Sequence, residues 1–195
     1  MRVWYYSRYM KYAIIVLLSL FIFSSVTSVS YAQTITLSAT ESAVATPPAI
    51  VQYDFPYPGI LPDHPLYFIK IVRDRVVGFL INDLVKKAEF NLLQSDKRIS
   101  AAQMLFDKDS DQLGVDTLSK SNNYMHNAIS VAKKADKANL PAEAVVGKIG
   151  VSISKHEEVM KSLIASNNPE KDSLKAEYKR LESIKAYYKK SFSKK

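Results

Sequence analysis

Cysteine is absent from the 195 residues of this chain. Its absence excludes disulfides, thiol catalysis, cysteine-ligated zinc and a lipoprotein anchor on an N-terminal cysteine. Stability must therefore come from packing alone. The roughly 140 residues that follow residue 52 are enough for one ordinary hydrophobic core.

Glycine is scarce, with five residues in the whole chain, and no glycine-rich loop that could cradle a phosphate is present. No serine lies in a Gly-x-Ser-x-Gly elbow. The tetrapeptide "SISK" at 152–155 matches Ser-x-x-Lys, but its companion motifs are missing, and a chance match is expected in a chain rich in serine and lysine. The sequence therefore predicts no enzyme and no cofactor.

The chain has three histidines, of which His126 and His156 stand almost symmetrically about Pro141. A hairpin of two helices would bring them to nearly the same height. At about 100° per residue, however, His156 falls inside the apolar stripe of its helix and His126 lies far from the stripe of the other. We expect the two not to face each other, and His156 to be a core-edge histidine with a hydrogen-bond partner. A small-ligand or metal-binding bundle that uses His156 remains the alternative.

The first 32 residues have the three parts of an export signal. The apolar run "AIIVLLSLFIF" at 13–23 is short for a membrane span, and small residues precede a cleavage site at Gln33. The positive segment before the run contains Arg2, Arg8 and Lys11 and no acid. We expect cleavage; an uncleaved anchor is the alternative, because the early tyrosines and Trp4 resemble an interfacial aromatic belt. The chain is therefore predicted to be extracellular or in the cell envelope.

Removal of that segment leaves 24 basic and 19 acidic residues, a net charge of +5. Residues 33–52 are rich in Ser, Thr, Ala and Pro and are predicted to form a linker. From residue 66 onward, apolar residues recur at helical spacing. We predict an all-α, up-and-down bundle over 65–192, with helices at about 65–81, 84–106 and 116–137 and two more opened by Pro141 and Pro169.

Four prolines crowd into "FPYPGILPDHPLYFIK" at 55–70. They keep the chain extended, so residues 53–64 are predicted to lie across the bundle as a strap. Asp63 is expected to be the N-cap of the first helix and Pro65 to fall in its first turn; Asp83 is expected to cap the second helix. A docking peptide for a proline-reading partner is a weaker interpretation.

The first predicted helix has a broad apolar face and is expected to be the most buried of the five. Arg73 lies close to this face. Because an unpaired buried charge is very costly, we predict that Arg73 forms a structural ion pair, with Glu89 or Asp96 as the nearest candidate partners.

The C-terminus "KAYYKKSFSKK" contains five lysines and no acid. Lysines at a helix C-terminus are favoured by the helix dipole, so a solvated basic end is the simplest interpretation, continuing into a tail at 193–195. The alternative is attraction to an anionic surface such as lipid headgroups or wall polymers. The candidate residues are Lys185, Lys189, Lys190, Lys194 and Lys195.

Three segments carry a resemblance: "YPGILPDHPLYFIK" at 57–70, "RDR" at 73–75 and "DLVKKAEFNLLQSDKRISAA" at 83–102. They resemble the signature of a prokaryotic family known only as a numbered domain of unknown function, with a Leu-Pro-Asp-x-Pro-x-Tyr start. Leu84 stands where that family often has proline, and His64 where it usually has a small residue. The resemblance implies an exported or membrane-anchored helical protein and implies no activity.

These observations together predict a non-enzymatic interaction module. Its partner is an unknown protein or a component of the cell envelope, with an anionic surface as a further candidate. Nothing in the sequence predicts recognition of a specific nucleic acid.

Overall fold

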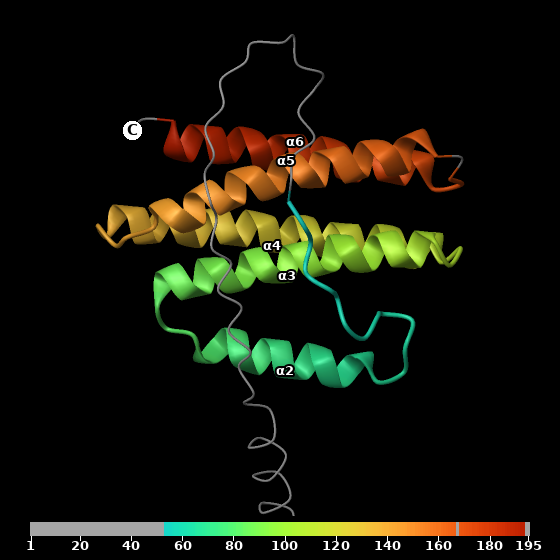
Figure 1. Cartoon of the computed structure of the whole chain (residues 1–195), viewed down its shortest axis with the longest axis horizontal. Helices are drawn as coiled ribbons and strands as arrows, with labels where there is room; N and C mark the ends of the chain where they lie inside the picture. The colour runs from blue at the N-terminus through green and yellow to red at the C-terminus, as the bar shows by residue number, and fades with distance from the viewer. Residues whose placement is uncertain (1–52, 167, 194–195) are drawn as a thin grey trace, which may run out of the picture. The chain divides into compact units, whose positions relative to one another are not determined.

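The computed structural model describes residues 53–166 and 168–193, and these form one compact helical unit (Figure 1). The predicted signal segment at 1–32, the linker at 33–52 and the last two residues of the tail lie outside the described residues. The described part contains five helices: α2 (Tyr67–Leu80), α3 (Leu84–Phe106), α4 (Asp111–Lys137), α5 (Glu143–Ala165) and α6 (Lys171–Phe192).

The helices follow one another up and down, joined by short turns, which confirms the predicted all-α bundle (Figure 1). Helices α3 to α6 make the bundle proper, and α3 and α4 are its most extensively packed pair. Two hydrophobic clusters fill it: one contains Met125, Ile129, Ile149 and Ile153, and the other Ile99, Leu118, Met160 and Leu174. The helical apolar spacing of these four segments therefore identified the core correctly.

The strap at 53–64 lies across the bundle before it reaches α2 (Figure 1). The hydroxyl of Tyr53 donates a hydrogen bond to Asp96 on α3 at 2.6 Å. The ring of Phe55 packs edge-on against His156 on α5, with centroids 5.2 Å apart. Farther along, Lys70 of α2 donates to the carbonyl oxygens of Pro58 and Ile60. The strap is thus held at both ends.

Of the predicted helix caps, one is confirmed and one is wrong. The carboxylate of Asp83 accepts the backbone N–H of Lys86 at 2.8 Å, as an N-cap does. Asp63, in contrast, does not cap α2, because the helix begins four residues later at Tyr67 and Leu66 is its N-cap residue. Pro65 accordingly lies in the turn before the helix and not in its first turn.

Asp63 has a different role in the fold. It forms an ion pair with Lys108, which follows α3, at 2.9 Å, and this hydrogen bond lowers the pKa of the Asp63 carboxyl group. His64 accepts the backbone N–H of Leu66 at 3.1 Å. The residues before α2 therefore join the strap to the α3–α4 turn.

None of the helices in the described part is long and apolar enough to cross a membrane.

Candidate functional site

Helix α2 presents most of its apolar side chains to solvent. Eight of the thirteen exposed large apolar side chains in the described residues lie between 66 and 80, and Phe79 is the most exposed of them at 82%. The only buried residue of α2 is Asp74. The prediction that this helix is the most buried of the five is therefore wrong. The physical reason is that α3 to α6 pack their apolar stripes against one another, so the core closes without the apolar side chains of α2.

The exposed side chains form one continuous face. At about 100° per residue, six of them fall within an arc of about 120°. Arg75 lies at one border of this arc, and Arg73 lies at the other border with Val77 beyond it. We call the arc the apolar face of α2; its residues are Phe68, Ile69, Val72, Val76, Phe79 and Leu80.

The opposite side of α2 carries Lys70 and the buried Asp74 and faces the bundle. Arg73 contacts the carboxylate of its neighbour Asp74 at 2.8 Å, and the Arg73 side chain is 64% exposed while that of Asp74 is 7% exposed. The predicted ion pair of Arg73 therefore exists, but its expected partners Glu89 and Asp96 are wrong. Because successive residues point 100° apart, the aspartate can turn inward while the arginine stays in water.

Two further contacts seat α2. Gly78 lies against the ring of Phe90 on α3, so close that a Cβ atom at this position would stand 3.0 Å from the ring. Lys70 is half-buried on the side of α2 that faces the strap, and burial lowers the pKa of its ammonium group. These contacts fix which side of α2 faces outward.

A second group of polar residues converges inside the bundle on Asp96. Its carboxylate accepts hydrogen bonds from the hydroxyl groups of Tyr53 and Ser152, both at 2.6 Å. Nε2 of His156 lies 2.9 Å from the same carboxylate and donates to it in the tautomer protonated there. The bond to Asp96 confirms the predicted hydrogen-bond partner of His156, but the histidine is fully buried and does not lie at the edge of the core as expected.

This cluster contains a serine, a histidine and an aspartate, but it differs from a catalytic triad. In a triad the serine hydroxyl bonds to the histidine, whereas here the serine and the histidine both bond to Asp96. The strap closes over them, and burial together with Asp96 raises the pKa of the Tyr53 hydroxyl group. The arrangement suits a structural connection between strap, α3 and α5.

The two histidines considered for a metal site contact different residues. The ring of His126 stacks on that of Tyr187, with centroids 5.2 Å apart, while His156 bonds to Asp96. The expectation that they do not face each other is confirmed. Within the described residues, no group of three or more His, Cys, Asp or Glu side chains could hold a metal ion.

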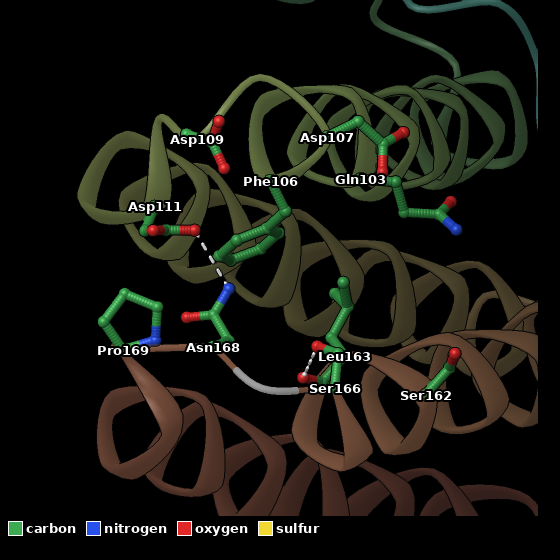
Figure 2. A pocket seen from close by; sticks show the side chains of 10 residues that line it. All are labelled: Gln103, Phe106, Asp107, Asp109, Asp111, Ser162, Leu163, Ser166, Asn168 and Pro169. Atoms are coloured by element: carbon green, nitrogen blue, oxygen red, sulfur yellow. Dashed lines mark hydrogen bonds between the residues drawn. The ribbon is translucent and has the colours of Figure 1, made fainter.

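A polar pocket of about 400 Å³ lies where the α3–α4 and α5–α6 turns meet (Figure 2). Asp107, Asp109 and Asp111 are among the side chains that line it. Asp111 already accepts a hydrogen bond from the amide of Asn168 at 2.9 Å, and this bond ties the two turns together (Figure 2). Part of the polar lining of this pocket is therefore used to hold the two turns together.

The C-terminal lysines are not equivalent. Lys185 is half-buried and forms an ion pair with Glu157 on α5 at 2.6 Å. Lys189 and Lys190 are exposed at the end of α6. Lys194 and Lys195 lie outside the described residues. Of the five candidate residues, Lys185 is thus already engaged within the bundle.

Fold and surface define an all-α bundle that carries one exposed apolar helix. The model of a family described as a domain of unknown function (DUF5667) matches residues 59–184, and the chain belongs to this family. The resemblance to a numbered family of unknown function is thereby confirmed. No curated protein and no solved structure matches the chain. The match includes the whole of α2 and ends before the five C-terminal lysines.

The apolar face of α2 is the functional candidate that sequence reasoning placed wrongly. Its signal was present, because an apolar arc with arginines at its borders is an unusual pattern for a core helix. The Asp96 cluster was missed except for His156. No local pattern links Tyr53, Asp96 and Ser152, which are more than forty residues apart in sequence.

Proposed function

We propose that this chain is a non-enzymatic interaction module of the cell envelope or extracellular space, exported by its N-terminal segment, with the apolar face of α2 as its contact surface. The observation that carries the proposal is the concentration of exposed apolar side chains on this one helix. Soluble monomers rarely leave a continuous apolar patch open unless it serves binding.

The seating of α2 supports the same conclusion. A helix that was merely detached would have no fixed orientation, but Asp74, Lys70 and Gly78 hold its polar side toward the bundle and the strap. These contacts therefore set the direction in which the apolar face points. Preorganisation of this kind lowers the cost of binding.

The non-enzymatic part of the proposal is supported by the burial of the chain's most enzyme-like residues. The side chains of Asp96 and His156 are 3% and 1% exposed, so a substrate would have to displace the strap to reach them. The alternative of anionic-surface binding through the C-terminus has less support, because Lys185 is paired with Glu157.

Photo-crosslinking in cells that naturally make the protein tests the proposal. A photoreactive residue replaces Val72 on the apolar face, and the control replaces Lys120, which is exposed on α4. We expect an adduct to an envelope component, either protein or lipid, from position 72 and none from position 120. Absence of any adduct at position 72 would overturn the proposal.

A further inference from the structure

We propose that the partner of the apolar face is a lipid bilayer with anionic headgroups, and that α2 lies in the plane of the bilayer surface. This inference rests on the proposed function and specifies its partner. It is carried by the position of the two arginines at the borders of the apolar face and by the length of α2.

The charge pattern favours an anionic partner. A helix that lies in a membrane surface buries its apolar side to about 5–10 Å and keeps basic residues at the headgroup level. Arg75 is exposed, and Arg73 keeps most of its side chain in water although it also contacts Asp74. Both guanidinium groups would meet phosphate oxygens when the arc between them enters the acyl region.

A bilayer suits a face confined to one helix of 14 residues, because it sets no minimum contact area and the gain grows with each apolar side chain that enters it.

Like charges argue in the same direction. Arg73 and Arg75 lie at the middle of α2, so an antiparallel pairing of two such helices about a two-fold axis would bring the arginines of both copies together. Facing like charges destabilise an interface. The helix is also too short to span a membrane, so it would lie on the surface and not across it.

The absence of cysteine allows a position-specific test on the full chain. Val72→Cys carries an environment-sensitive dye on the apolar face, and Lys120→Cys carries the same dye on α4. Each protein is mixed with vesicles of phosphatidylcholine alone or with added phosphatidylglycerol. We expect a blue shift, and quenching by a lipid-borne quencher, only at position 72 and only with phosphatidylglycerol. Both proteins share the N-terminal segment, so adsorption through that segment alone would leave both dyes in water.

Two substitutions sharpen the test in the Val72→Cys protein. Phe79→Ser removes the most exposed apolar side chain and should weaken vesicle binding about tenfold or more. Arg75→Gln should weaken it about fivefold at low salt, whereas Lys120→Gln should leave it unchanged. Arg73 is left intact because its loss would leave the buried Asp74 without its partner.

Other results would overturn the inference in distinguishable ways. A vesicle-independent shift at position 72 that grows with protein concentration would indicate a second copy. A shift already present in dilute protein would indicate that another segment of the same chain covers the face. An adduct from position 72 to protein alone, with no response to vesicles, would retain the interaction module and reject the bilayer. No adduct and no vesicle response would reject both.

Discussion

Helices α2 and α5 are about equally apolar in sequence, but they lie in opposite environments. Helix α5 buries several large apolar side chains, among them Ile149 and Ile153, and it packs against α3, α4 and α6. Helix α2 buries only Asp74 and has no comparable packing partner in the described part of the chain. Burial is therefore decided by the apolar surface available opposite a helix, and not by its own hydrophobicity.

The polar contacts of the two helices differ in the same sense. Helix α5 directs Ser152 and His156 onto the buried carboxylate of Asp96, so its contact with α3 combines apolar packing with hydrogen bonds to a buried acceptor. The buried carboxylate of α2, Asp74, has an exposed arginine as its partner. The contact at Asp96 connects α5 to α3 inside the bundle, whereas the contact at Asp74 only orients a surface helix.

The largest effect is expected from the two carboxylates. Asp96→Ala leaves the buried donors of Ser152 and His156 and the partly buried hydroxyl group of Tyr53 without their acceptor, and should lower the free energy of unfolding by about 3–5 kcal/mol. Asp74→Ala removes a pair with an exposed arginine and should cost about 1 kcal/mol or less. Urea unfolding followed by circular dichroism measures both.

Asp172→Ala is the control for these variants, because Asp172 is exposed on α6 and its loss should change stability by no more than about 0.5 kcal/mol. Equal losses for Asp96→Ala and Asp74→Ala would show that the two contacts are not different in kind.

The apolar side chains give the second comparison. Ile153→Ala empties a buried site on α5 and should cost about 2–5 kcal/mol. Val72→Ala shortens a side chain that is 56% exposed and should change the free energy of unfolding by no more than about 0.5 kcal/mol. A loss above about 1 kcal/mol for Val72→Ala would mean that the apolar face is covered in solution.

The strap supplies a third comparison, because it covers the polar residues of α5 at His156 and does not cover the apolar face of α2. Tyr53→Phe removes the hydrogen bond to Asp96 and should cost about 1–3 kcal/mol at neutral pH. Wild-type protein should also lose stability above about pH 10, because the Tyr53 pKa is raised in the folded state above its ordinary value of 10.0.

The sign of this pH effect follows from the direction of the pKa shift. Below pH 10 the hydroxyl group is neutral in both states, and its contribution is complete. Above that value the unfolded chain releases the proton first, so the contribution shrinks. The stability difference between wild type and Tyr53→Phe should therefore narrow as the pH rises, and a constant difference from pH 8 to 11 would show that Tyr53 does not titrate abnormally.

The sequence predicted the bundle well because its signals are local. The stripes of α3 to α6 recur at helical spacing within single segments, and Asp83 lies directly before the helix that it caps. The resemblance carried by 57–102 also identified the family correctly. The prediction that Asp63 caps α2 was wrong, although its signal is local as well. A residue can cap a helix only if the first turn forms directly after it, and α2 begins four residues later, at Tyr67.

What the sequence could not give is which surface each apolar stripe meets. The stripes of α2 and α5 are similar in hydrophobicity, and although the arginines beside the stripe of α2 were a signal, only the completed packing of α3 to α6 shows that this stripe stays exposed. The same limit hid the Asp96 cluster, whose members come from the strap, α3 and α5. Contacts between residues that are far apart in sequence cannot be predicted from the pattern of any single segment.

Glycines give the smallest and most local comparison of the two helices. Gly147 of α5 has no atom within 4 Å of an added Cβ atom, whereas an added Cβ at Gly78 of α2 would lie 3.0 Å from the ring of Phe90. Gly147→Ala should therefore gain about 0.5–1 kcal/mol from reduced backbone entropy in the unfolded chain. Gly78→Ala has the same entropic gain, but the Phe90 ring has to shift, so we expect a smaller gain or a slight loss. Thermal unfolding of the two variants in parallel measures the difference. Equal gains would show that α2 stands away from α3, in which case its orientation, and with it the outward direction of the apolar face, would no longer be fixed by this contact.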